Sequence, residues 1–324
     1  MEQIPLFHDS HLLANAADTS LAALRLDEAI TRYQTYAELY GEDERTSHKR
    51  KLAKDLKEGL NRLLRGEGPC PDDFCALWES VFEKAQARGL DKSSLLPVIR
   101  QSFFRLASDV LKRRDPDHFR GVGIRFPLGY ILMMAGDLKE AIQDLRSQIA
   151  RDPENARLCG YLGDAFYRSG NIHAASRCYF DACLIDPAAL DWRHLQNREL
   201  ISLQEELSDD RDRPETDRVA WVAVVACLRG IISPHPIDRP QKFTALVERY
   251  LDMEKTFIQT HDPRTAARLF LIGMVLCGHE PLLRHIKGVD LASIRTRMKD
   301  VNASLFEQYL QTVERRWENP RKRP

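Results

Sequence analysis

Histidine and aspartate, which can both bind metal ions, gather at two places in the chain. His8-Asp9-Ser10-His11 lies near the N-terminus, and His261-Asp262 lies in the C-terminal half. Metal sites on helices place their ligands at spacings such as i and i+4, so that the side chains share one face. Neither group has such a spacing, and helix capping explains the aspartates better. We therefore expect no metal and no cofactor.

The motifs that position catalytic groups in common enzyme classes are missing from the sequence. It has no nucleophile elbow, no paired-carboxylate motif and no phosphate-binding loop. Gly66-Glu67-Gly68 lacks the Lys-Ser/Thr that such a loop needs. We expect a non-enzymatic protein. An enzyme built from scattered residues stays open, and it would need a cleft of ionisable groups with shifted pKa values.

Three basic clusters could contact phosphate groups: His48 to Lys51, Lys112 to Arg114, and Arg321 to Arg323. Acidic residues adjoin the first two clusters, and no aromatic platform for bases accompanies any of them. The 48 basic and 48 acidic side chains also cancel, so that no overall field attracts nucleic acid or an anionic membrane. Solvated helix ends explain the clusters better than direct nucleic-acid binding.

The N-terminal pentapeptide Gln3-Ile4-Pro5-Leu6-Phe7 resembles the Q-x-x-L-F peptide with which bacterial DNA-replication and repair proteins dock on the sliding clamp. The resemblance implies a bacterial-like accessory factor in DNA metabolism whose clamp contacts are Gln3, Leu6 and Phe7. Pro5 interrupts any helix here, so residues 1–9 are expected to form an extended arm. The alternative is that Leu6 and Phe7 pack against the first helical hairpin.

Composition indicates a folded, helix-rich chain. It has 324 residues, of which 43% are hydrophobic and 30% charged, with only 16 glycines and 16 prolines. Seven cysteines form an odd set without a CxxC pair, which favours a reducing compartment. The N-terminus has no signal region, and no apolar run reaches the length of a membrane span. We expect a cytoplasmic protein without membrane contact.

Two segments repeat small and helix-breaking residues at a spacing of 34. The first copy contains Leu128, Gly129, Gly136, Ala141 and Pro153, and the second contains Leu162, Gly163, Gly170, Ala175 and Pro187. The second copy also places Phe166, Tyr179 and Ala182 at apolar positions of the helical pattern. A recurring period of this length is the signature of stacked supersecondary units.

Each small residue in the second copy has a physical reason. Gly163 and Ala175 allow two helices to cross closely, because a larger side chain would force the backbones apart. Gly170 ends the first helix, since glycine enters the left-handed conformation without steric cost. Pro187 closes the hairpin, because proline cannot continue a helix. The sequence therefore predicts two helical hairpins between about residues 122 and 189.

The second copy, with Cys159, Leu162-Gly163, Phe166, Ala175, Tyr179 and Pro187, resembles the tetratricopeptide repeat, with Cys in place of the usual Trp. The first copy is looser. The resemblance covers about a fifth of the chain and implies an all-α superhelix, a right-handed solenoid with flanking N- and C-terminal helices.

In the resembled family, the first helices of successive repeats line a concave groove that binds a partner peptide or helix. Carried over by position, the groove residues here are Phe126, Tyr130, Met133, Met134, Arg157, Asp164, Tyr167 and Arg168. This mixture suits a peptide with one hydrophobic anchor and acidic flanks. Tyr130 and Asp164 stand where the carboxylate-clamp version has Asn, which argues against a chaperone C-terminus as the partner.

The resemblance thus implies a non-enzymatic interaction scaffold or adaptor for another protein. Two interpretations of the groove stay open, since the protein's own helices could fill it instead. The predicted organisation is an N-terminal helical region with a candidate degenerate repeat (1–120), a repeat pair with a capping helix from Asp191 to Leu207 (121–207), a charged linker (208–217) and a C-terminal helical region (218–324).

Three further expectations concern the flanking regions. The candidate degenerate repeat rests on the segment from Leu26 to Ile30, which resembles Leu138 to Ile142 of the first clear repeat. A charged helix is expected over residues 44–65, with leucines along one face. The last helix is expected from Asp290 to Glu318.

Overall fold

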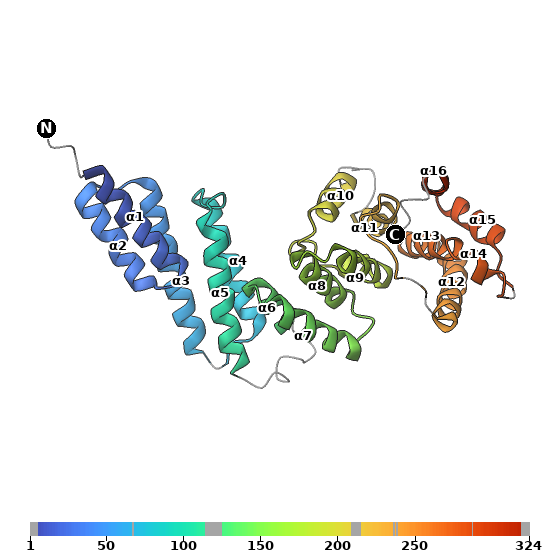
Figure 1. Ribbon diagram of the computed structural model, residues 1–324, viewed down its shortest axis with the longest axis horizontal. Helices are drawn as coiled ribbons and strands as arrows, with labels where there is room; N and C mark the ends of the chain where they lie inside the picture. The colour runs from blue at the N-terminus through green and yellow to red at the C-terminus, as the bar shows by residue number, and fades with distance from the viewer. Residues whose placement is uncertain are drawn as a thin grey trace. The chain divides into compact units, whose positions relative to one another are not determined.

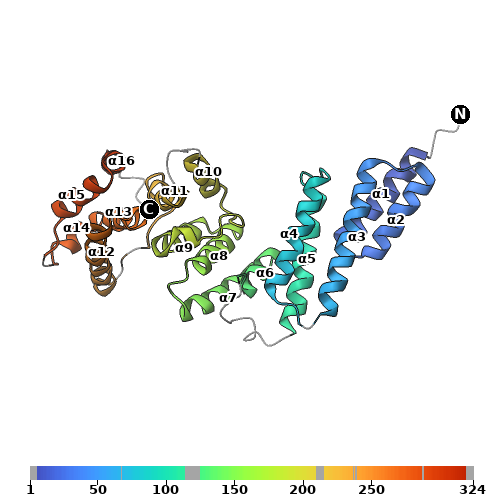
Figure 2. The same ribbon diagram turned by 180° about the vertical axis from the view of Figure 1, so that it is seen from behind.

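A computed structural model gives the fold shown in Figures 1 and 2. It describes residues 6–66, 68–113, 125–208, 215–235, 237, 239–286 and 288–318, with no side-chain description at 6–8, 215–217 and 315–318. Throughout these residues the regular elements are helices, which confirms the predicted all-α, tetratricopeptide-like class. None of the helices described is long and apolar enough to span a bilayer.

The chain divides into two compact units, residues 1–148 and 149–324. Unit 1 contains α1 (Leu6–Ala22), α2 (Leu26–Tyr40), α3 (Glu44–Arg65), α4 (Pro71–Ala87), α5 (Leu95–Lys112), α6 (Leu128–Ala135) and most of α7 (Leu138–Arg151).

Unit 2 begins with the second hairpin of the repeat pair. It contains α8 (Ala156–Arg168), α9 (Ile172–Ile185), the 3-10 turn η2 (Pro187–Ala189), α10 (Arg198–Ser208), α11 (Glu215–Leu228), α12 (Pro240–Thr260), α13 (Pro263–Cys277), α14 (Glu280–Leu283), α15 (Leu291–Val301) and α16 (Ala303–Glu318).

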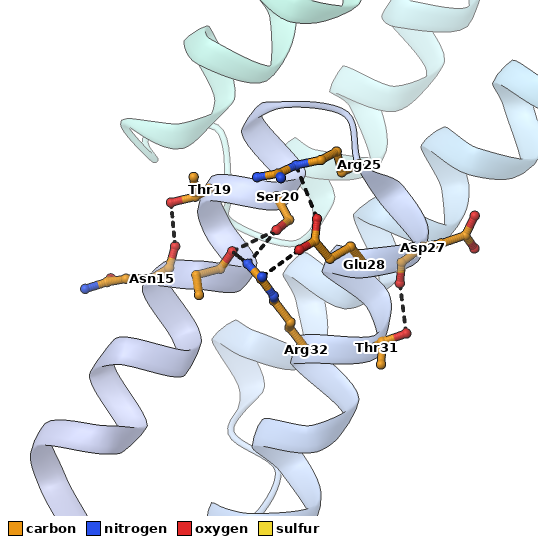
Figure 3. A network of polar contacts seen from close by, with 9 residues as sticks. Asn15, Thr19, Ser20, Arg25, Asp27, Glu28, Thr31 and Arg32 are labelled. Carbon is orange, nitrogen blue, oxygen red and sulfur yellow. Dashed lines mark hydrogen bonds and ion pairs between the residues drawn. The ribbon is translucent and has the colours of Figure 1, made fainter.

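Polar contacts join the first three helices of unit 1. In Figure 3, Nη1 of Arg32 on α2 donates to the oxygens of Ala16 and Ser20 on α1, at 2.8 Å each. Next to this contact, Asp18 on α1 accepts a hydrogen bond of 2.6 Å from Tyr33 OH and forms an ion pair of 2.6 Å with Lys49 on α3. One largely buried carboxylate thus links α1, α2 and α3.

Aromatic side chains form the core between α4, α5 and α6. Trp78 lies 5.5 Å from Phe103, measured between ring centroids, and Phe103 lies 5.4 Å from Phe104. Phe104 in turn contacts Tyr130 of α6 edge-on at 6.4 Å. Phe103 and Phe104 are almost fully buried, and Phe104 gives α6 an apolar contact with α5.

Glycines of the repeat pair lie where two helices cross and where a helix ends. A Cβ placed on Gly163 would lie 2.7 Å from the Tyr179 ring, and one on Gly129 would lie 2.6 Å from Leu145 Cγ. Gly136 and Gly170 follow α6 and α8 with φ of 96° and 79°. The other predicted small and apolar repeat residues are buried: Leu128, Ala141, Leu162, Phe166, Ala175 and Ala182.

Helix α11 lies at the centre of unit 2. It packs against α9, η2, α10, α13 and α16, and its run from Val219 to Cys227 is almost entirely buried. A second close crossing lies between α13 and α15, where a Cβ on Gly273 would approach Met298 Sδ to 2.9 Å. The hairpin α8/α9 and the C-terminal helices therefore share one compact unit.

Four expectations differ from the structure. Helix α1 already begins at Leu6, so that residues 6–9 are helical rather than extended. The capping helix begins at Arg198 instead of Asp191. The single helix expected from 290 to 318 divides at Asn302, whose side chain caps α16 by accepting from the Leu305 N–H. The boundary between the two units falls at 148/149, inside the segment 121–207 that is expected to hold the repeat pair and its capping helix. Residues 209–214 of the expected linker lie outside the described residues.

Candidate functional site

The groove residues predicted in the first hairpin are buried by the protein itself. Phe126, Tyr130, Met133 and Met134 are each at most 5% exposed. Phe126 and Tyr130 stack with ring centroids 4.8 Å apart, and Tyr130 also contacts Phe104. The expectation that these four side chains form an open surface is therefore wrong for this structure. Helix α6 packs against α5, and all four side chains are buried.

A carboxylate at the start of α4 fixes the backbone that leads into α6. Oδ2 of Asp72 accepts from the Arg125 N–H at 2.9 Å, and Oδ1 accepts from the Phe126 N–H at 2.7 Å. At the other end of α6, Gln101 of α5 donates to the Ala135 carbonyl at 3.3 Å. Both ends of α6 are thus tied to the N-terminal helices, which explains why its predicted groove face is closed.

Asp164, the acidic groove residue predicted on α8, is also buried, with 1% of its surface exposed. Its Oδ1 accepts hydrogen bonds from Tyr179 OH at 2.6 Å and from the Gln196 N–H at 2.8 Å. Its Oδ2 is buried and has no hydrogen-bond partner among the residues that the structure describes. Asp164 therefore belongs to the interior and is not exposed to a partner.

The segment from Leu190 to Asn197 covers this part of α8. A Cβ on Gly160 would lie 2.7 Å from Leu190 Cδ2, so the absence of a side chain at 160 lets Leu190 approach the helix. Asp191 accepts from Tyr161 OH at 2.9 Å and contacts His194 Nδ1 at 2.9 Å. The irregular segment occupies the position where a regular solenoid would continue with its next helix.

Burial raises the pKa of Asp164 to about 7, although the hydrogen bonds from Tyr179 and Gln196 favour the ionised form. The nearby charge of Arg168 also lowers this pKa, and that of Asp191 raises it. The carboxyl group therefore changes its charge near neutral pH, inside the contact between α8, α9 and the covering segment. A shifted pKa of this kind marks candidate functional sites as well as structural networks.

Three predicted groove residues remain accessible. Arg157, Tyr167 and Arg168 are half-buried on α8. Arg157 and Arg168 are eleven residues apart, which places them on the same side of the helix about three turns apart, and Tyr167 is rotated by about 100° from Arg168. We call these three side chains the α8 surface. It presents two guanidinium groups and one phenol, and it is the part of the predicted groove that a partner can reach.

The remaining sequence candidates are placed as follows. Gln3 lies outside the described residues, and Leu6 and Phe7 begin α1 without described side chains, so clamp docking stays a prediction. In the basic clusters, Lys49, Arg50 and Lys112 form ion pairs with Asp18, Glu42 and Glu140, whereas Arg114 and 321–323 lie outside the description. Over the described part of the chain, no group of three or more potential metal ligands is close together.

Residues 132–198 match the family model described as tetratricopeptide repeat. The match confirms the predicted resemblance from residue 132, within α6, through α9, and it extends to the start of α10. It supports a protein–protein interaction scaffold in general terms. No curated protein and no solved structure matches the chain.

Proposed function

We propose that the chain is a non-enzymatic scaffold that binds another protein through the α8 surface, Arg157, Tyr167 and Arg168. The observation that carries this proposal is the contrast in burial along the predicted groove. Five of its eight residues are closed off by the protein itself, whereas these three lie on one helix and are partly exposed. The match of residues 132–198 to the tetratricopeptide repeat supports a protein as the ligand.

The chemistry of the α8 surface suits an acidic peptide with an aromatic or aliphatic residue. Arginine binds carboxylates through paired N–H donors, which a lysine could not do in the same geometry. The tyrosine ring adds apolar contact area at a low cost in side-chain entropy. Buried Asp164 does not oppose an acidic ligand while its carboxyl is protonated, a form that is present up to about pH 7.

The test compares capture of partner proteins by the purified full-length chain and by the double variant Arg157→Ala/Tyr167→Ala. Both side chains are partly exposed, so the helical circular dichroism signal should stay unchanged. We expect the variant to lose at least one partner that the wild type retains. Arg177→Ala on α9, also half-buried, is the matched control and should retain it. Equal partner sets for wild type and double variant would reject the α8 surface as the binding site.

We place this scaffold in the cytoplasm. The seven cysteines are all free, and six of them are buried. Burial raises the pKa of the Cys159 and Cys183 thiols to about 12 in each case, so that they stay protonated and unreactive. Thiols in this state fit a reducing compartment.

A further inference from the structure

Unit 2 contains a pocket of about 550 Å³ that the predicted groove does not include. Residues from α9, α10, α13 and α16 line it, together with the end of α11 and the loop that follows. The volume lies within the range of about 300 to 1,000 Å³ that is usual for ligand sites. The pocket lies where α11 and α13 both end, at Leu228 and Cys277.

The lining is mainly aliphatic, and part of it is open to solvent. Leu228, Ile231, Met274 and Val313 are half-buried, and Ile172 at the rim is 53% exposed. A single exposed aliphatic side chain on a surface needs no explanation, but several around one concavity form a binding surface for an apolar group. Met274 adds a side chain that can adjust its shape to irregular ligands.

Among the described lining residues of this pocket, the carboxylate is not balanced by a lysine or arginine. Glu199 is an exposed carboxylate in the lining, and among the lining residues described there is no lysine or arginine. The C-terminal ends of α11 and α13 add the negative ends of two helix dipoles. Two arginines adjoin lining residues in the sequence. Arg229 forms a two-bond ion pair with Glu206 at 2.6 Å, so its charge is compensated, and Arg198 is exposed at the start of α10, next to Glu199. The other ionisable side chains here are His173, His279 and Tyr309.

From this combination we propose that the pocket binds a protein segment with an aliphatic anchor next to a lysine or arginine. The aliphatic side chain fills the space between Leu228, Met274 and Val313, and the cation lies near Glu199. This proposal depends on the proposed scaffold function in one respect, namely that the ligand is a segment of a protein. It adds a second docking position whose preferred charge is opposite to that of the α8 surface.

The test uses three short fluorescent peptides and fluorescence anisotropy with the full-length chain. The first has a Leu-Leu core flanked by lysines, the second has the same core flanked by glutamates, and the third has a Ser-Ser core flanked by lysines. We expect the first to bind most tightly, because only it supplies both the apolar anchor and the cation. Equal binding of all three peptides, or preference for the glutamate peptide, would overturn the proposal.

Two variants locate that binding at the pocket. Ile172→Ser and Glu199→Lys both change exposed side chains, so folding should be unaffected. Each variant should weaken binding of the first peptide, here called the lysine–leucine peptide, by about fivefold. Glu199→Lys should also strengthen binding of the peptide flanked by glutamates. The matched controls are Ile258→Ser on α12, where the side chain is 52% exposed, and Glu205→Lys on α10. If the controls weaken binding as much as the pocket variants, the peptide binds elsewhere and the proposal is wrong.

The same measurement separates this inference from the proposed function. The double variant Arg157→Ala/Tyr167→Ala should bind the lysine–leucine peptide like the wild type, since neither residue lines the pocket. If wild type and double variant captured the same partners, the α8 surface would be rejected as a binding site, but the expected binding of the peptide to the pocket would not change. Loss of peptide binding in the double variant would contradict the assignment to the pocket.

Discussion

At three of the helix crossings that the structure describes, glycine sets the distance between the helices. The missing side chains of Gly129, Gly163 and Gly273 leave room for Leu145, Tyr179 and Met298 of the facing helices. The first two follow from the 34-residue pattern, because they recur with the alanines twelve residues later. Gly273 could not be predicted in this way, since it has no counterpart at that spacing and its role depends on α15, which is distant in sequence.

The crossing at Gly163 has little freedom to adjust. The Tyr179 ring is fully buried and its hydroxyl is held by Asp164, so a methyl group at 163 has to displace the helix. We expect Gly163→Ala to lower the free energy of unfolding by about 1 to 3 kcal/mol. Denaturant unfolding of the purified chain measures this change.

The matched control is Gly59→Ala on α3. A Cβ there meets only the end of the Leu77 side chain, which is half-buried and able to rotate. Its stability should stay within about 1 kcal/mol of wild type, because alanine also favours the helix. A Gly163→Ala protein as stable as this control would show that the helices do not cross as closely as described.

Asp164 gives the stability a pH dependence with a defined sign. Its pKa is about 7 in the folded chain and near the ordinary value of 3.8 when unfolded. The folded state therefore holds its proton while the unfolded state releases it, and raising the pH from about 4 to about 7 destabilises the fold. The loss approaches roughly 4 kcal/mol above the folded pKa.

The variant Asp164→Asn isolates this effect, since its amide resembles the protonated carboxyl and does not titrate. We expect wild type and variant to have similar free energies of unfolding near pH 4, where the carboxyl group is protonated in the folded wild type. The variant should become the more stable of the two as the pH rises through 7. A difference between the two proteins that stays constant with pH would contradict the raised pKa.

At the scale of helices, the same contact occurs in α1/α2 and α8/α9. Tyr33 donates to Asp18 and Tyr179 donates to Asp164, each at 2.6 Å and fifteen residues apart. Ala17 and Ala29 are fully buried and stand at the positions of Gly163 and Ala175. These correspondences support the hypothesis that α1/α2 is a degenerate repeat, which the resemblance of Leu26 to Ile30 with the start of α7 had suggested.

Most helices could be predicted from periodic apolar residues with caps and breakers, and α3 has the expected bounds of 44–65. The start of α10 was missed because Trp192 and Leu195 continue a helical spacing. Asn197 is the signal that would have found it, since its side chain accepts from the Glu199 and Leu200 N–H groups as a helix cap. Periodicity alone does not show where a cap outweighs apolar spacing.

The attachment of α6 to α4 through Asp72 is open to direct test. Asp72→Ala removes the acceptor for the Arg125 and Phe126 N–H groups. We expect a loss of about 1 to 2 kcal/mol in stability and faster hydrogen exchange along α6, from Tyr130 onward. Asp73→Ala, which removes contacts of the Asp73 carboxylate with Cys70, is the control and should leave exchange in α6 unchanged. Unaltered α6 exchange in Asp72→Ala would contradict this role.

At the scale of the whole chain, the sequence predicted the fold class and the location of the repeats but not which groove residues stay accessible. Phe126 and Tyr130 have the size and polarity of a binding surface, and nothing in their own segment shows that Phe104 contacts Tyr130. Burial of this kind depends on contacts between distant segments. For the same reason the boundary at 148/149, within a recognisable repeat pair, had no local signal.

The most direct test of the account is site-specific photocrosslinking in the native cell. Para-azidophenylalanine, which is close to tyrosine in size, replaces Tyr167 in one protein and Tyr130 in another. The account predicts covalent adducts with a second protein from position 167, and none from position 130, which is 2% exposed. A partner adduct at 130, or none at 167, would contradict the claim that partners reach this chain through the α8 surface.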